Sequence, residues 1–409
     1  MTTTHPAPTL RGSVASYVSS VAGNYAFLVL SFGISIYLTR TLGPEGFGRL
    51  TLVLAVAQTV SLFACFWTQA GFLRHGTEEL ARSGNLRRVF WARMLVASVP
   101  LAGFLLLGWP LRHLVARFHG VADVGYAALA TYLVALFVAQ TLQVMYQARG
   151  RAGLYAFVQA GERALVLAGL LLYGLTAAPG QAAVLALYVA ASLAASVAAA
   201  ALVDRHDVVP VGTTGPTVRR FAVFSWPILL GVFGSYLTSN WLDVVVHRHF
   251  LGSEAVGQFA LAYQLMGAVQ QVPMVSFPVV VPYLVAAHVA GRVDTIDTYL
   301  ERVVPHAVFG MVALLSAGIV IGPLVIVPVF GAGFAAAARA LPVLLFAVGW
   351  YCVFIAYIPL LNLRERTRAM LVASLAAAAA NVGGNLLLVP RWGVDGAAWA
   401  AVASQAAGA

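Results

Sequence analysis

The sequence predicts an all-α integral membrane protein with about twelve transmembrane helices, arranged in two six-helix lobes around a central cavity. Composition, the length of the apolar runs and an internal repeat lead to this fold class. Hydrophobic residues make up 61% of the chain and charged residues only 9%, and the mean hydropathy is +0.87. Soluble domains carry roughly 25% charged residues, so this chain is too poor in charge to cover a soluble surface.

The apolar runs have the length and pattern of membrane-spanning helices. Each holds about 20 residues, which as a helix crosses ~30 Å of hydrocarbon. Backbone polar groups must be satisfied internally in lipid, and the runs lack the alternation of barrel strands, so helices are expected. The predicted cores are residues 14–39, 50–73, 94–111, 124–147, 154–175, 181–203, 221–246, 256–286, 303–330, 335–361, 369–389 and 394–409.

The distribution of arginine predicts that the N-terminus is cytoplasmic. The predicted loops on the N-terminal side hold about twice as many arginines as the opposite loops, and basic loops tend to remain in the cytoplasm. The net charge of +10 therefore indicates orientation and not nucleic-acid binding, because the arginines form no block. The first ten residues lack the features of a cleavable signal peptide. The last segment reaches Ala409 without a charged stop, which indicates a longer chain or a marginal final helix.

One loop motif occurs twice. Residues 42–50 read "LGPEGFGRL" and residues 251–259 read "LGSEAVGQF", with the shared frame Leu-Gly-x-Glu-x-x-Gly. Weaker matches in the same order follow each copy. Each half then holds six helices in the same orientation, and such parallel repeats are typical of alternating-access transporters. We therefore expect a first lobe over 1–203, a cytoplasmic linker over 204–220 and a second lobe over 221–409.

The loops leave little room for catalysis. The longest gaps between spans hold about 20 residues, and the chain has no phosphate-binding loop, zinc-protease motif or nucleophile elbow. We predict no catalytic residues, no cofactor and no metal site, and we interpret Cys65 and Cys352 as buried structural thiols. Without an ATP-binding element, transport would use an ion gradient, the membrane potential or a partner.

Charged residues inside a span mark candidate transport sites, because a charge in hydrocarbon is costly. Glu162 and Arg163 lie about eight residues into the fifth predicted span, roughly 12 Å deep. Neighbours in a helix point in different directions. They are either substrate-binding groups or residues that bond two different helices.

The seventh predicted span carries one polar face. Tyr236, Asn240, Asp243 and His247 are spaced 4, 3 and 4 apart, which places them on one side of a helix. The face either lines a water-filled cavity, the interpretation we favour, or forms a hydrogen-bonded seam with a neighbouring helix. In the first case Asp243 is a candidate site for a coupling proton or cation.

Other polar residues complete the set of candidate cavity residues. For the uncharged ones, bonding between helices competes with substrate contact. They are Asn24, Gln140, Gln143, Arg302 and His306, with Asn381 and Asn385 in the eleventh predicted span.

Several stretches resemble a known family. "YLTRTLGPEGFGRLTLVLAVAQ" at 37–58 is similar to the first loop of the polysaccharide biosynthesis, or Wzx-type oligosaccharide flippase, family. A basic amphipathic stretch, "GFLRHGTEELARSGNLRR", follows the second span, and "GVDGAAWAAVASQ" opens the twelfth. The resemblance covers essentially the whole chain and extends to the superfamily of multidrug, oligosaccharidyl-lipid and polysaccharide exporters.

The resemblance implies a function. It implies a multi-pass protein of the bacterial inner membrane that moves undecaprenyl-diphosphate-linked oligosaccharide from the cytoplasmic to the outer leaflet, with the lipid-linked oligosaccharide and the bilayer as partners. A polysaccharide polymerase and glycosyltransferases are expected to work beside it. A multidrug exporter, a lipid II flippase and, less favoured, a polysaccharide polymerase or ligase are the alternatives.

Overall fold

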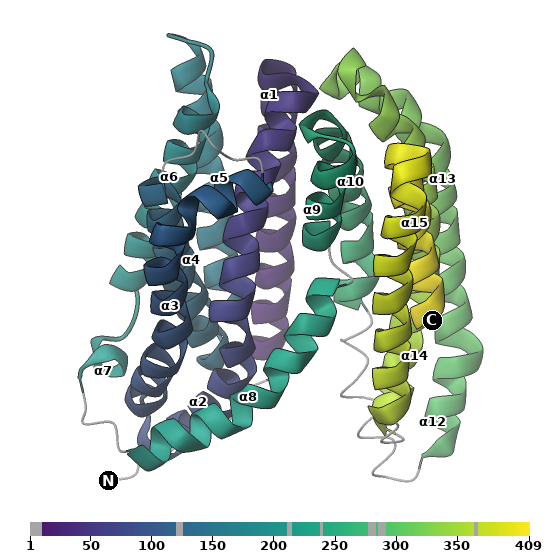
Figure 1. Cartoon of the computed structure of the whole chain (residues 1–409). Helices are drawn as coiled ribbons and strands as arrows, with labels where there is room; N and C mark the ends of the chain where they lie inside the picture. The colour runs from purple at the N-terminus through teal and green to yellow at the C-terminus, as the bar shows by residue number, and fades with distance from the viewer. Residues whose placement is uncertain are drawn as a thin grey trace. The chain divides into compact units, whose positions relative to one another are not determined.

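Every described element of regular structure in the computed structural model is a helix (Figure 1). The structure describes residues 10–119, 126–210, 215–237, 240–276, 284, 292–363 and 367–409. The chain forms two compact units. Unit 1 comprises Met1–Thr41 and Leu52–Phe233, and unit 2 comprises Leu42–Thr51 and Gly234–Ala409.

Unit 1 is built from the N-terminal helices, whose apolar faces pack around shared cores. One core joins Phe72 of α2, Val89 of α3, Met145 of α4 and Phe221 of α8. The helices are α1 (Leu10–Ala64, partly in unit 2), the 3-10 turn η1 (Phe66–Thr68), α2 (Gln69–Ser83), α3 (Arg87–His119), α4 (Tyr126–Ala148), α5 (Ala152–Gly174), α6 (Gln181–Ala201), α7 (Arg205–Val208) and α8 (Gly215–Leu237, whose last turn lies in unit 2).

Unit 2 is centred on α14, which packs against α10, α13 and α15. Its elements are α9 (Asn240–Phe250), α10 (Ser253–Ser276), α12 (Val293–Thr298), the π-helical turn η3 (Tyr299–Val303), α13 (Val304–Phe330), the 3-10 turn η4 (Ala332–Phe334), α14 (Ala335–Leu363) and α15 (Thr367–Gly408). The predicted seventh span, residues 221–246, overlaps α8 and α9, and residues 238–239 between them lie outside the described part of the structure.

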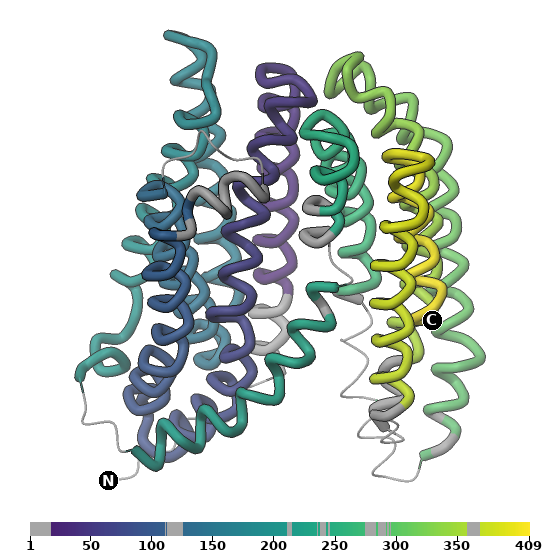
Figure 2. Tube along the Cα trace, in the orientation of Figure 1, coloured from purple at the N-terminus to yellow at the C-terminus, as the bar shows by residue number. Residues whose placement is uncertain are grey.

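Eight stretches among the described residues are long and apolar enough to cross a membrane. The two longest, Val18–Ser83 with 66 residues and Ala369–Gly408 with 40, exceed a single crossing. Each contains a glycine with non-helical backbone angles, Gly43 in α1 and Gly393 in α15. In α15 the two limbs lie side by side, since the Ser404 hydroxyl donates to the Ala377 carbonyl oxygen at 3.0 Å (Figure 2). α1 and α15 are thus each two helices joined by a bend, and the stretch Val18–Ser83 also contains η1 and α2.

The repeated motif has the same local structure in both copies. Gly43 and Gly252 have positive φ angles of 65° and 92°, a conformation that favours glycine. A helical segment begins after each of them. Its glutamate contacts the side chain one turn later: Glu45 pairs with Arg49 at 2.5 Å, and Glu254 accepts from Gln258 at 3.4 Å. Both glutamates therefore stabilise a helix start.

The two copies also contact each other within unit 2, glycine against glycine. A Cβ atom added to Gly257 would meet the Pro44 carbonyl oxygen and would lie 2.9 Å from the Gly48 nitrogen. One added to Gly48 would meet the Ser253 carbonyl oxygen and would lie 2.8 Å from the Gly257 nitrogen. Pro44 and Ser253 hold the same place in the motif, so the contact is symmetric. The motif's final glycine is required by this close approach.

We expect Gly257→Ala to destabilise the protein by about 1–3 kcal/mol, the usual cost of overpacking. Gly267→Ala is a matched control in the same helix, because no atom of the described residues lies within 4 Å of its added Cβ. Alanine is the better helix former, so Gly267→Ala should leave thermal stability unchanged or raised. Thermal unfolding in detergent measures both, and equal unfolding midpoints for the two variants would contradict the close contact.

The predicted linker, residues 204–220, is tied to unit 1. Asp207 is fully buried in α7 and accepts from Arg149 at 2.5 and 2.6 Å and from the Leu86 backbone nitrogen at 2.9 Å. These bonds raise the pKa of the Arg149 guanidinium above its usual value. The boundary between the compact units falls later, after Phe233. The proposed lobes 1–203 and 221–409 therefore do not coincide with the compact units.

Asp207→Asn should lower the stability of unit 1 by about 3–5 kcal/mol, because it breaks a buried ion pair. Asp204→Asn serves as the control. Asp204 is 45% exposed, lies 3.6 Å from Arg149 and caps α7, and asparagine caps a helix equally well. Thermal unfolding should show a clearly lower midpoint for Asp207→Asn alone, and equal midpoints would show that the linker is not anchored by this pair.

Candidate functional site

Asp243 lies at the centre of a buried polar cluster in unit 2. It is on α9, and its Oδ1 accepts hydrogen bonds from the Nδ2 atoms of Asn381 and Asn385 on α15, both at 2.9 Å. Asn381 Nδ2 also donates to the Leu237 carbonyl oxygen at 3.0 Å. The side chains of Asp243, Asn381 and Asn385 are at most 2% exposed. The carboxyl group is therefore held in place by amide donors from a distant part of the chain.

His247 extends this cluster by one helical turn. Its Nε2 lies 3.3 Å from Asn385 Oδ1. When the imidazole proton is on Nε2, this nitrogen donates a hydrogen bond to that oxygen. Its ring packs edge-on against Phe259, with 4.3 Å between the ring centroids. Its Nδ1 is buried and has no hydrogen-bond partner in the described part of the chain. Asp243 and His247 share one helix face, as their spacing predicts.

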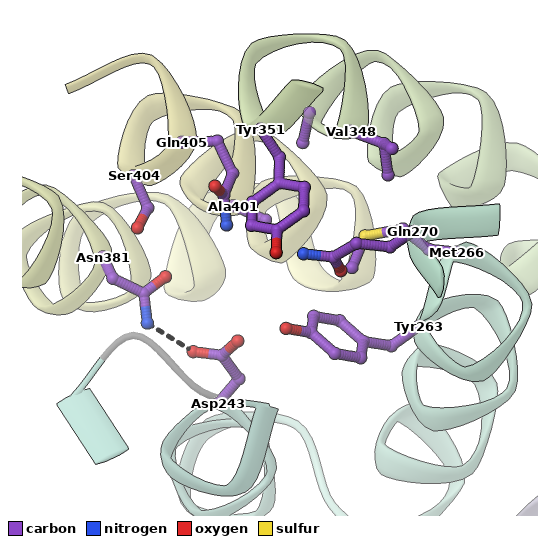
Figure 3. Close-up of a pocket in the computed structure, with 11 residues that line it drawn as sticks. Asp243, Tyr263, Met266, Gln270, Val348, Tyr351, Asn381, Ala401, Ser404 and Gln405 are labelled. Atoms are coloured by element: carbon purple, nitrogen blue, oxygen red, sulfur yellow. Dashed lines mark hydrogen bonds between the residues drawn. The ribbon is translucent and has the colours of Figure 1, made fainter. Parts of the chain in front are cut away.

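The Asp243 carboxyl group faces a small cavity (Figure 3). Tyr263, Gln270, Tyr351 and Asn381 point toward the same space. The cavity has a volume of about 10 Å³. This is close to the smallest volume that holds one water molecule. The remaining lining residues are Met266, Ala347, Val348, Ala401, Ser404 and Gln405. The space suits one small ion or water.

The chemistry of this lining favours a proton or a hard cation. Carboxylate, amide and hydroxyl oxygens surround the space, and oxygen ligands are those that hard cations prefer. No basic side chain pairs with Asp243 among the described residues. A buried carboxylate is stable only when it is protonated or paired, so the cluster can take up and release one positive charge. Asp243 therefore both bonds to α15 and borders this small space.

A second candidate site lies in unit 1, around Arg163 of α5. Its guanidinium carbon is 4.9 Å from the ring centroid of Phe27 on α1 and 5.4 Å from that of Tyr188 on α6. Its Nε is buried without a hydrogen-bond partner in the described ranges. Glu162 lines a small space with Tyr155 and Ser196, and it also interacts with Ser192 and, electrostatically, with Arg163. The two charges thus face different neighbours, and Arg163 keeps hydrogen-bonding capacity for an anion.

The other sequence candidates do not gather at either site. Gln140 Nε2 lies 2.5 Å from the Ser61 hydroxyl oxygen, which fits a bond between helices. Asn24 is exposed and Gln143 is half-buried. Arg302 and His306 are exposed, and His306 Nδ1 contacts the Arg302 carbonyl oxygen at 2.6 Å. The Asn240 side chain lies outside the described part of the structure.

The third predicted span, residues 94–111, starts too late and leaves Arg93 outside the helix. α3 begins at Arg87 and not near residue 94, because Glu79 accepts from the backbone nitrogens of Arg88 and Val89 at 2.9 and 2.8 Å and so caps the helix. Arg93 is consequently inside α3 and fully buried. Cys65 and Cys352 are buried free thiols, as predicted.

Comparison with known proteins identifies the family and the fold. The polysaccharide biosynthesis protein family matches residues 13–288. Comparison with curated protein sequences finds no match. Among solved structures, an inward-facing MATE family multidrug resistance transporter of the MOP superfamily has a TM-score of 0.75 at 13% identity, covering 95% of this chain and 94% of that one.

Two further structures share the fold. The lipid II flippase MurJ, in an inward closed conformation, has a TM-score of 0.70 at 12% identity, covering 98% of this chain and 86% of that chain. A MOP superfamily transporter from Pyrococcus furiosus, described as having a binding pocket of reverse polarity, has a TM-score of 0.55 at 14% identity, covering 97% and 92%. The family match extends over more than half of the chain, which therefore belongs to the polysaccharide biosynthesis protein family and has the multi-pass membrane fold of MOP superfamily transporters.

Proposed function

We propose that this protein is a flippase that moves an undecaprenyl-diphosphate-linked oligosaccharide from the cytoplasmic to the outer leaflet of the bacterial inner membrane. The product would supply surface polysaccharide assembly, such as O-antigen, capsule or exopolysaccharide. The N-terminus would be cytoplasmic. Glycosyltransferases would act before this step and a polymerase after it. The single observation that carries the proposal is a cation inside the membrane in a polysaccharide biosynthesis family member, Arg163.

The chemistry of Arg163 fits this cargo. A diphosphate carries negative charge, and a guanidinium forms paired hydrogen bonds with phosphate oxygens. Two aromatic rings hold the side chain, while its Nε remains unbonded among the described residues. Transfer of a diphosphate through hydrocarbon is costly unless its charge is compensated. Arg163 would compensate it while the lipid tail remains in the bilayer.

The Asp243 cluster would couple this step to an ion gradient. Uptake of a proton or small cation by Asp243 changes the charge of a buried group and therefore the relative stability of conformations that expose it differently. The chain has no ATP-binding motif, so a gradient is the energy source that this geometry supports.

Deletion of the gene in its host tests the proposal. Surface polysaccharide should be lost and lipid-linked repeat units should accumulate on the cytoplasmic side, with both defects reversed by the intact gene. Normal export without accumulation would overturn it. If growth stopped and lipid II accumulated, the cargo would be lipid II. A changed drug susceptibility with normal polysaccharide would indicate a multidrug exporter, and polymers of altered length would indicate a polymerase.

A further inference from the structure

We propose that unit 1 contains a phosphate-binding site between α2, α3 and α8, separate from Arg163 and independent of the transported cargo. The phosphate group belongs either to a membrane lipid head or to a soluble compound. A cavity of about 250 Å³ opens there. Its basic lining residues are His75, Arg82, Arg87, Arg88 and Arg220, and its other lining residues are Glu78, Glu79, Ser83, Asn85, Val89, Ala92, Thr217 and Phe221.

The acidic residues of the cavity are already engaged. Both oxygens of Glu79 accept backbone hydrogen bonds at the start of α3, at 2.9 and 2.8 Å. Glu78 accepts from Arg220 at 2.9 Å. Arg82 and Arg88 have no ion-pair partner among the described residues. Four arginines against two glutamates leave an excess of positive charge, so the cavity suits an anion.

His75 forms part of the wall and has hydrogen-bonding capacity to spare. It is 9% exposed, and neither of its ring nitrogens has a hydrogen-bond partner in the described part of the chain. Its Nδ1 is 3.7 Å from a Glu78 oxygen, too far for a hydrogen bond. The rings of Phe221 and Phe224 lie 6.3 and 5.2 Å away, between centroids. A buried imidazole that lines a cavity and has no hydrogen-bond partner among the described residues points to a ligand oxygen.

Arg93 supplies a second, independent observation. It follows the lining residue Ala92, is fully buried, and has no hydrogen-bond partner for its Nε or either terminal nitrogen within the described ranges. Its guanidinium carbon lies 5.8 Å from the centroid of the Phe72 ring, and it also interacts electrostatically with the Cys65 thiol. Phe72 belongs to the same apolar cluster as the cavity residues Val89, Ala92 and Phe221. Arg93 does not itself line the cavity. A buried cation without a counter-charge is costly, and an anion bound beside α3 would offset part of that cost.

The arrangement favours phosphate over a single carboxylate. Several arginines border one space, and guanidinium groups match the geometry of phosphate oxygens. The cavity lies where amphipathic α2 meets the start of α3. Amphipathic helices favour the interface of a membrane, where the lipid phosphates are. A lipid head is therefore the source we expect.

Binding to the protein in a maltoside detergent, which carries no phosphate, tests this site. One arm titrates inorganic phosphate by calorimetry, and the other adds phosphatidylglycerol and counts retained lipid by native mass spectrometry. We expect the double variant Arg82→Gln, Arg88→Gln to bind about tenfold more weakly whichever of the two, inorganic phosphate or phosphatidylglycerol, binds to the intact protein. Arg151→Gln with Arg205→Gln is the matched control, because both residues are exposed in unit 1 and neither lines the cavity. Its binding should stay within about twofold of the intact protein.

The variant Arg93→Met separates a ligand-related role of Arg93 from a purely structural one, because only the first role changes how much the ligand raises the unfolding temperature. Without the phosphate compound, the variant should unfold at the same temperature as the intact protein or a higher one, because it removes a buried charge. The ligand identified in the first experiment should raise the unfolding temperature of the intact protein more than that of the variant. No binding to the intact protein in either arm, or equal loss in the cavity and control variants, would overturn the proposal without touching the flippase assignment.

Discussion

Asp243→Asn should reduce transport about tenfold or more and remove its dependence on the coupling ion. A hydrogen bond to a charged group contributes about 1.5–3 kcal/mol. Loss of that free energy changes the equilibrium constant for ion binding about tenfold or more. Asparagine has nearly the same shape and can still accept from Asn381 and Asn385. It can neither take up a proton nor supply a charge to a cation. The protein should therefore fold normally and lose its response to the ion.

The measurement is transport at several sodium concentrations and several pH values, with expression checked in parallel. Glu254→Gln is the control in the same unit. Glu254 is exposed, and its carboxylate accepts a hydrogen bond from Gln258, one turn along the same helix. It should retain the ion dependence of the intact protein. An Asp243→Asn variant that responds to sodium and pH like the intact protein would remove Asp243 as the coupling site.

Arg163→Ala should strongly impair export without lowering expression. The variant loses the cation that we propose compensates the diphosphate charge, and Arg163→Lys should restore export only in part, because lysine lacks the planar fork that pairs with phosphate. Complementation of a deletion strain, scored by surface polysaccharide, measures the effect.

Arg112→Ala is the matched control for this experiment. Arg112 also stacks on an aromatic ring, with its guanidinium carbon 4.6 Å from the Trp109 centroid, and it lies in the same unit. Its removal should leave export near normal. Full export by a well-expressed Arg163→Ala variant would show that Arg163 only holds α5 against its neighbours.

The local elements of the fold could be predicted from the sequence, because they depend on short-range pattern. Apolar runs gave the helices, and Gly43 and Gly252 marked two equivalent helix starts. The partners of Asp243 could not be predicted. Asn381 and Asn385 lie 138 and 142 residues further along the chain. Their spacing of four residues predicts one shared face but does not say which helix that face meets.

The burial of two charged side chains also could not be predicted from the sequence. Arg93 and Asp207 both fall outside the predicted spans, yet both are buried. Asp207 is buried because Arg149, 58 residues earlier, pairs with it. Arg93 is buried because the cap at Glu79 starts α3 early. Burial of a charge depends on tertiary partners, which a single sequence does not place.

The central claim is that this protein moves a lipid-linked oligosaccharide across a bilayer, and reconstitution tests it most directly. Proteoliposomes loaded with a fluorescent polyprenyl-diphosphate oligosaccharide in one leaflet are probed from the other side with a reagent that cannot cross the membrane. We predict that the intact protein under an ion gradient makes the oligosaccharide reactive and that Arg163→Ala proteoliposomes do so far more slowly. An oligosaccharide that stays protected with the intact protein, at the rate seen in protein-free liposomes, would contradict the claim.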